Sequence, residues 1–341
     1  PWVPTMRRGL QVPTREQCRR GSAIALRHRK HYSAREASMV AVLRGSALGS
    51  LSRLSSDTRV VESGDGHATI RWHLKRAGVI TELFHYDIAK FLAGDSYLPK
   101  AGEYLIPAGA SLADTLALIH QGKSHQRRVT IIEGMTVAQI VGLLDDVSTL
   151  TGEIQATPDE GSLLPETYFF TYGTSRQALL DRMQQKREME LIEAWLDRSA
   201  DLPLKTPQEA VVLASIVELE TGDSADRREV AGVFVNRLRT GMRLQSDPTV
   251  LYGVDDNTSR PIRKSDLKRR TAWNTYVIKG LPQTAICNPS RESIEAVLQP
   301  AKTANMYFVS DGNGGLLFAK TLDAHNKNVR LFRKRRASAA Q

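Results

Sequence analysis

The chain has 341 residues, of which 41% are apolar and 25% are charged, as in an ordinary globular protein. Its formal net charge of +10 lies at the ends, because residues 1–56 carry +9 and residues 327–341 carry +6, which leaves −5 between them. The mildly acidic centre argues against a nucleic-acid-binding fold. No apolar stretch approaches the roughly 20 residues that a membrane-spanning helix needs.

The sequence offers no sign of a cofactor or a metal. Its eight histidines and two cysteines show no metal-binding spacing. A dinucleotide-binding fingerprint and a phosphate-binding loop are also missing from the sequence. We therefore predict an activity that uses no cofactor.

The first part of the chain predicts a leader and then a small αβ unit. Residues 1–58 are rich in Arg and Ser and lack periodicity, which is typical of disorder. Helical spacing of apolar residues follows at 67–80 and 82–94. A strand, a glycine, a hydroxyl residue and a helix then occur twice, at 102–119 and at 127–144.

The hydroxyl residues of this repeat, Ser111 and Thr136, are natural helix N-caps, and Asp114 would complete a capping box with Ser111. The repeat has two interpretations. It is either a common αβ unit that occurs twice, or it contains a small carbohydrate-binding module of LysM type. Both interpretations stay open on the pattern alone, and a LysM-like subdomain would occupy residues 59–126.

The rest of the chain predicts a larger domain at 127–341 that ends in a basic tail. Thr206 and Pro207 mark the start of a strongly signalled helix. Asn313 and Gly314 mark the turn of a β-hairpin within 305–321. The fold class is therefore α/β, with helices and strands mixed. The helices are expected at 175–199, 202–222, 225–241 and 290–299.

The helix at 202–222 contains the stretch LASIVELETG, which places Glu218 and Glu220 inside an apolar run. On a helix these two side chains point to nearly opposite sides. Large residues flank Glu220, so we expect it to be packed or paired structurally. Small residues flank Glu218, so a cleft could pass there, and desolvation would then favour the protonated acid that donates a proton to a leaving oxygen.

Two interpretations of Glu218 remain at this point. It is the acid of a catalytic cleft, or it only forms a structural ion pair with an arginine such as Arg227 or Arg237. Ordinary glycoside hydrolysis uses two carboxylates. One is enough when the substrate supplies its own nucleophile.

Several long motifs decide in favour of catalysis. They are LASIVELET, VAGVFVNRLRTGMRLQSDPTVLYG, GSLLPETYFF, WNTYVIKGLP, AICNPSRESIEAVLQPA, MYFVSDG and LDAHNKNV. From about residue 60 to about residue 330 the chain resembles the MltG/YceG-like family of endolytic murein transglycosylases. The resemblance implies a LysM-like subdomain, a mixed α/β catalytic domain and an N-terminal membrane helix, in whose place this chain has Arg/Ser-rich sequence.

The resemblance also implies an activity and a place in the cell. Such an enzyme cleaves nascent peptidoglycan strands between N-acetylmuramic acid and N-acetylglucosamine, leaves a 1,6-anhydro end and so terminates strand elongation. The family's catalytic glutamate corresponds to Glu218. Glu220 would have a supporting or structural role and would not take part in the reaction itself. The implied location is the periplasmic face of the bacterial inner membrane. The implied partners are peptidoglycan strands and peptidoglycan synthases, the penicillin-binding proteins.

Polar and aromatic residues of the shared motifs suit a sugar groove, where amides and hydroxyls bind sugar hydroxyls and aromatic rings stack on pyranoses. Each of them could instead stabilise a loop, and Asp247 before a proline is typical of a turn. The candidates for substrate binding are Gln245, Ser246, Asp247, Tyr252, Asn274, Thr275, Tyr276 and Glu166.

The chain departs from the family pattern at four positions. Trp273 replaces a tyrosine, Gln283 and Ala285 replace prolines, and Leu316 replaces a histidine. Two other functions therefore stay open. One is a peptidoglycan-binding protein of the same fold with weakened catalysis. The other is a glycoside hydrolase that pairs Glu218 with Glu166 or Asp247.

Overall fold

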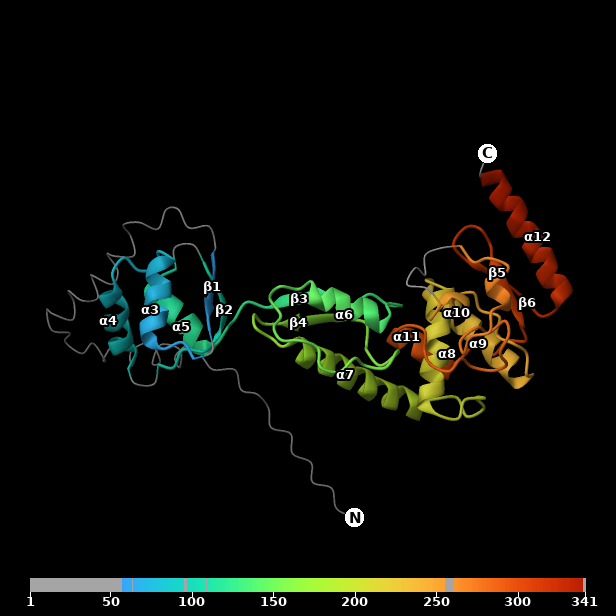
Figure 1. The fold of residues 1–341 in the computed structure, drawn as a ribbon, viewed down its shortest axis with the longest axis horizontal. Coiled ribbons are helices and arrows are strands. Elements are labelled where there is room, and N and C mark those ends of the chain that lie inside the picture. The colour runs from blue at the N-terminus through green and yellow to red at the C-terminus, as the bar shows by residue number, and fades with distance from the viewer. Residues whose placement is uncertain (1–56, 63, 95–96, 108–109, 255–260, 340–341) are drawn as a thin grey trace, which may run out of the picture. The chain divides into compact units, whose positions relative to one another are not determined.

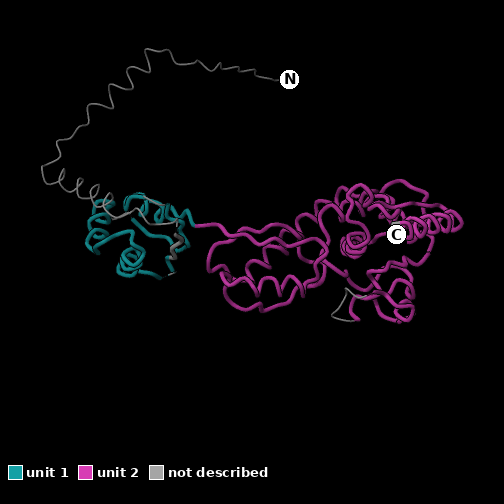
Figure 2. Tube along the Cα trace, turned by 90° about the horizontal axis from the view of Figure 1, so that it is seen from above, with its two compact units in different colours: residues 1–124 teal, residues 125–341 magenta. Residues whose placement is uncertain are grey.

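The computed structural model describes most of the chain after the predicted leader (Figure 1). The described residues are 57–62, 64–94, 97–107, 110–254 and 261–339. The leader predicted at 1–58 lies outside them except for its last two residues. The chain divides into two compact units, residues 1–124 and residues 125–341, which Figure 2 shows in different colours.

In the described part of the first unit, three helices pack beside one antiparallel pair of strands. Its core contains the fully buried rings of Tyr86 and Tyr104 together with Ile70 and Ile119. Tyr104 donates its hydroxyl hydrogen to the Lys100 carbonyl, which meets the need of a buried polar group for a partner. The elements are β1 (Asp57–Val61), α3 (His67–Arg76), α4 (Leu83–Ala93), β2 (Gly102–Ile106) and α5 (Leu112–Gln121).

The predicted helices of this unit are confirmed, although α3 ends four residues earlier than expected. The capping box of Ser111 and Asp114 is present at the start of α5. Strand β1 was not predicted, because five residues next to an unpatterned leader carry too little signal. A LysM-like character for this unit stays a prediction.

The second unit begins with an antiparallel pair of strands, separated in sequence by a helix, and two helices pack on this pair. Thr136 caps α6 through a capping box with Gln139. The apolar side chains of these elements form one cluster that includes Ile140, Leu163 and Met183. The elements are β3 (Arg127–Thr130), α6 (Val137–Asp145), β4 (Thr167–Phe170) and α7 (Arg176–Leu196), with β3 and β4 antiparallel.

Helix α8 (Pro207–Glu220) is the centre of the next layer. Thr206 caps it as predicted, although Glu209 reaches back to the amide of Lys205 instead of that of Thr206. Every residue from Ala210 to Glu218 is buried, as a helix that is apolar all round should be. Around it lie α9 (Ser224–Arg239), α10 (Pro248–Leu251), the short 3₁₀ helix η1 (Asp266–Lys268) and α11 (Arg291–Leu298).

The chain ends in a hairpin and a helix. Strands β5 (Tyr307–Ser310) and β6 (Leu316–Ala319) pair antiparallel across the predicted turn. Helix α12 (Leu322–Ala339) packs against both strands, where His325 stacks on Tyr307. The prediction of only a basic tail here was incomplete. Within the described ranges, no helix is both long and apolar enough to cross a membrane.

Gly232 in α9 offers a test of the packing around α8. A Cβ atom there would lie 2.7 Å from the carbonyl oxygen of Ala301 and 2.8 Å from a Thr303 methyl group. Gly232→Ala should therefore lower the free energy of unfolding by about 1–3 kcal/mol, although alanine favours helix.

The matched control is Gly142→Ala in α6, where a Cβ atom would meet nothing within 4 Å. That change should stabilise the protein by roughly 0.5–1 kcal/mol. Thermal unfolding of both variants checks the prediction, and a stabilised Gly232→Ala variant would contradict it.

Candidate active site

The two glutamates of α8 face different surroundings, as their helical spacing predicts. Glu218 is turned toward α9 and the start of α11, where it meets Arg227 and Ser290. Glu220 is turned toward the loop before α10, where it meets Ser246. Helix α8 therefore separates two polar sites.

The side chain of Glu218 is almost completely buried, with 4% of it exposed. Its Oε2 accepts hydrogen bonds from the backbone N–H of Ser290, at 2.7 Å, and from the Ser290 hydroxyl. Its Oε1 accepts one from the Arg227 guanidinium at 3.2 Å. The arginine pairing considered from the sequence is thus present, so Glu218 is not an isolated acid that only burial affects.

Ser290 reaches Glu218 because Asn288 fixes the segment before it. The side chain of Asn288 is fully buried. Its Oδ1 accepts from the Leu163 amide at 2.9 Å, and its Nδ2 donates to the Met135 carbonyl at 3.0 Å. Ser290 also caps α11 by accepting from the amide of Ser293. One asparagine thus ties three distant segments around Glu218.

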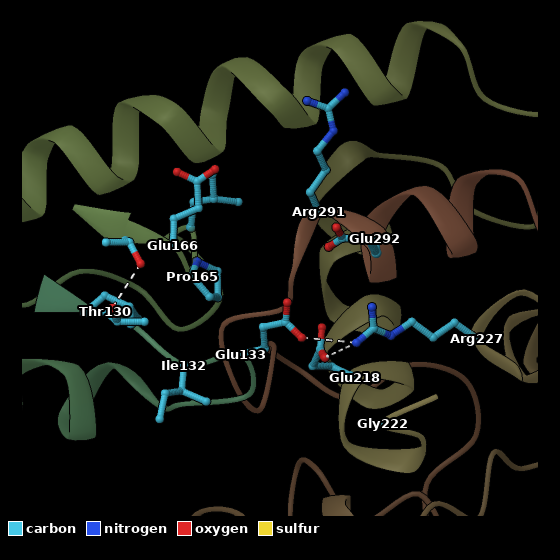
Figure 3. A pocket seen from close by; sticks show the side chains of 13 residues that line it. Thr130, Ile132, Glu133, Pro165, Glu166, Glu218, Gly222, Arg227, Arg291 and Glu292 are labelled. Carbon is cyan, nitrogen blue, oxygen red and sulfur yellow. Dashed lines mark hydrogen bonds and ion pairs between the residues drawn. The ribbon is translucent and has the colours of Figure 1, made fainter. Parts of the chain in front are cut away.

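Glu218 lines a cavity of about 640 Å³, which Figure 3 shows from close by. Its wall comes from β3 and the turn after it, the start of β4, the end of α8, α9 and the start of α11. Of the predicted substrate residues it contains Glu166, which pairs with Lys186. The lining residues are Thr130, Ile131, Ile132, Glu133, Leu164, Pro165, Glu166, Thr167, Glu218, Gly222, Arg227, Arg291 and Glu292.

The sequence analysis missed a second carboxyl group at Arg227. The Oε2 atom of Glu133 lies 3.2 Å from the same Arg227 nitrogen that holds Glu218. Figure 3 shows both contacts as dashed lines. The available signal was Gly134, whose φ of +78° allows the turn and whose missing side chain lets Leu219 approach.

Glu220 lies in a different electrostatic environment. Its Oε1 accepts a 2.5 Å hydrogen bond from the Ser246 hydroxyl. Burial raises the pKa of Glu220 to about 7, and the nearby charge of Asp247 acts in the same direction. Glu220 is therefore a carboxyl group of α8 whose pKa is raised by its burial.

The residues predicted for a sugar groove fall into two groups. Ser246, Asn274 and Thr275 are buried and hold the loops together, for example through the Ser246 amide and the Thr275 hydroxyl at 2.9 Å. Gln245 and Asp247 are exposed. Gln245 adopts a left-handed φ of +50°, a strained state that marks functional loops.

Two tyrosines stand near these loops. The Tyr276 hydroxyl donates to Asp247 at 2.6 Å, on the Glu220 side of α8. The Tyr252 hydroxyl donates to Glu160 at 3.1 Å, and its ring packs edge-on against Trp273. Trp273 in turn lies close over Gly253, so the departure from tyrosine at this position is accommodated by a missing side chain.

The structure thus brings Glu166 together with Glu218 and gathers Ser246, Asp247 and Tyr276 around Glu220. Leu316 packs against the apolar core beside α8 and α9. The long helix and its cap could be predicted from sequence. The division of the polar loops between its two sides could not.

Comparison with known proteins now gives the family. The YceG-like family matches residues 60–331, which include every residue of both sites. The chain belongs to this family. An endolytic murein transglycosylase of Bacillus subtilis is 29% identical over 300 residues, which cover 78% of this chain and 82% of that protein.

Two further proteins are also similar to this chain. An endolytic murein transglycosylase of Streptococcus pneumoniae is 29% identical over 278 residues, 67% of this chain, and the match spans half of that protein. A crystal structure of a YceG-like protein from Listeria monocytogenes is 28% identical with a TM-score of 0.49, covering 80% of this chain and 99% of that one.

The raised pKa of Glu220 predicts a pH-dependent stability. Between its ordinary value of 4.5 and about 7, folded Glu220 holds a proton that the unfolded chain has released. Its contribution is therefore present at low pH and lost as the pH rises through 7. Glu220→Gln should be more stable relative to wild type at pH 8 than at pH 5, by on the order of 2 kcal/mol.

Urea unfolding at both pH values measures this difference. The exposed Glu153→Gln variant serves as the control and should show no comparable change between the two pH values. An equal effect of Glu220→Gln at both pH values would contradict the assignment.

Proposed function

We propose that the protein is an endolytic murein transglycosylase that acts on peptidoglycan strands. The observation that carries the proposal is Glu218, a buried carboxyl group on the wall of a cavity about 640 Å³ in volume. Its place in a YceG-like chain, whose Bacillus subtilis relative carries that name, supports the same reaction. The product would be a strand with a 1,6-anhydromuramic end, and strand elongation would stop there.

Glu218 would act first as the acid and then as the base. Ser290 fixes Oε2 through two hydrogen bonds, so Oε1, which also accepts from Arg227 at 3.2 Å, would be the atom that carries the proton. This proton passes to the glycosidic oxygen as the bond from that oxygen to the muramic C1 breaks. The muramic C6 hydroxyl oxygen then bonds to C1 and gives its proton back to Glu218. Because the nucleophile belongs to the substrate, its effective concentration is high.

The sugar contacts we propose are those with accessible side chains. Glu166 lies in the cavity with Glu218. Gln245 and Asp247 are exposed, and Tyr252 and Tyr276 are half-buried. Ser246, Asn274 and Thr275 would act by holding the loops that present these groups. Residues 59–126 would form the LysM-like subdomain and residues 127–341 the catalytic domain.

The cellular setting belongs to the same proposal. We place the enzyme at the periplasmic face of the inner membrane, where nascent strands are made. Peptidoglycan synthases of the penicillin-binding type would be its partners, because a terminator must reach strands during elongation. Neither assignment rests on a helix that crosses the membrane in the described part of the chain.

One observation favours a second candidate. Glu133 and Glu166 line the same cavity as Glu218, so a hydrolase with two carboxylates has its groups available. The products separate the alternatives. Mass spectrometry of muropeptides would show anhydro ends for the transglycosylase, reducing ends for a hydrolase and no cleavage for a weakened binding protein.

Replacement of Glu218 tests the mechanism. In Glu218→Gln the amide oxygen can still accept from Ser290, but the side chain can neither donate nor take back the proton. Formation of anhydro ends should fall by at least about 10²–10⁴-fold, the usual worth of general acid–base catalysis. The melting temperature should show that the protein remains folded.

Glu220→Gln is the matched control, because the same change is made on the opposite side of α8. It should retain cleavage. If Glu218 were only an ion-pair partner, Glu218→Gln would lose stability yet cleave in proportion to its folded fraction, and that result would refute the mechanism.

A further inference from the structure

A single nitrogen atom of Arg227 contacts two carboxyl groups. Glu218 and Glu133, which are 85 positions apart in the sequence, each place an oxygen 3.2 Å from its Nη2 atom. The arginine side chain is only 8% exposed, and its Nε has no hydrogen-bond partner among the described residues. Two negative groups and one positive group thus meet at the cavity wall.

This arrangement bears on a difficulty in the proposed chemistry. A carboxyl group that accepts from a guanidinium, a backbone N–H and a hydroxyl is favoured in its charged form. Glu218 has all three donors. The acid step, however, needs a proton on Glu218. Another group must therefore weaken the electrostatic attraction between Arg227 and Glu218.

We propose that Glu133 is a positioning residue that engages Arg227 and so allows Glu218 to carry the catalytic proton. With Glu133 charged, the guanidinium is already neutralised, and a proton on Glu218 leaves no unpaired charge. Without Glu133, the arginine would stabilise the charged form of Glu218 alone. The inference rests on the proposed function of Glu218 and explains how that group is set for it.

Burial distinguishes the two carboxyl groups. The Glu133 side chain is 48% exposed and the Glu218 side chain 4% exposed. Water stabilises a charge on an exposed group, whereas burial disfavours one. Glu133 is therefore the better placed of the two to act as the charged partner of Arg227.

The fold holds Glu133 firmly at this place. The amide of Gly134 donates to the Asn288 carbonyl at 3.1 Å, and the amide of Asn288 donates to the Met135 carbonyl at 2.9 Å. A Cβ atom added to Gly134 would lie 3.9 Å from the Cγ atom of Glu218, so the turn lies close to this side chain. The turn that carries Glu133 is thus fixed against the helix that carries Glu218.

Other charged groups also line the cavity, and most are neutralised by partners of their own. Glu166, which directly precedes β4, pairs with Lys186 of α7. Arg291 of α11 pairs with Glu295 at 2.7 Å and Glu190 at 3.8 Å. Glu292 is the remaining charged residue on the wall. Arg227 contacts Glu133 and Glu218 and no other carboxyl group among the described residues.

The test is the rate of anhydro-end formation by Glu133→Gln across pH, on purified peptidoglycan strands. Catalysis by a protonated acid fails as the pH rises. In the variant this alkaline loss should begin at lower pH by about one unit or more, the usual effect of an uncompensated neighbouring charge. Activity at neutral pH should fall about tenfold or more and return as the pH is lowered.

Two further variants sharpen the test. Glu133→Asp keeps the charge with a shorter reach and should restore part of the wild-type profile. Glu188→Gln is the matched control, because Glu188 is 61% exposed and lies 3.2 Å from Arg187, which is 7% exposed. It removes an equivalent ion pair elsewhere and should leave the profile unchanged.

Two results would overturn the inference. One is a Glu133→Gln profile that coincides with wild type. The other is an equal loss of activity at every pH, which would make Glu133 a catalytic or structural group instead. Neither result touches the proposed function, which fails only if wild type produces no anhydro ends or Glu218→Gln still does.

Discussion

The catalytic unit is organised around one buried carboxyl group. A charge taken out of water is costly unless partners replace the water, and Glu218 receives a guanidinium, a hydroxyl and a backbone N–H. The backbone N–H belongs to Ser290 at the start of α11, where the partial positive charge of the helix also favours an anion. The segment before Ser290 must therefore run along α8. It is held there by the Ile286 amide, which donates to the Ser215 hydroxyl at 3.1 Å, and by the buried side chain of Asn288.

The two sides of α8 show how neighbours decide the behaviour of identical side chains. Glu218 and Glu220 are two residues apart on one helix, and both are largely removed from water. Glu218 faces a guanidinium at hydrogen-bonding distance, whereas Glu220 faces a serine hydroxyl with the carboxylate of Asp247 nearby. Burial and like charge raise the pKa of Glu220.

Much of the fold could be predicted from signals that lie within a few residues of one another. The features that were not predicted depend on contacts between segments far apart in the sequence. The caps Ser111 and Thr206 and the turn at Asn313 are encoded within a few residues, and all were predicted. Helix α12 was missed because six basic residues hide a weak apolar face of Val329 and Phe332 at helical spacing. Among the candidate site residues, Glu218 could be proposed from the sequence because its helix has a strong pattern and its motif a clear family likeness. Glu133 could not, since Gly134 after it signals only a turn, and nothing nearby in the sequence indicates that this turn packs against α8. The burial of Asn274 and Thr275 likewise depends on loops with no periodicity.

The choice of arginine at position 227 follows from the geometry of the site. A guanidinium spreads its charge over a planar fork of donors and is more weakly hydrated than the ammonium group of lysine, so it tolerates burial beside carboxyl groups. At 8% exposure, Arg227 can hold Glu218 from within the core while its Nη2 reaches the cavity wall and Glu133. A lysine would bring a compact charge that must lose more hydration. Breaking such a buried pair from one side leaves a charge without compensation, which costs far more than the pair contributes. The cluster is therefore one unit of three side chains, in which an exposed and a buried carboxyl group share one guanidinium.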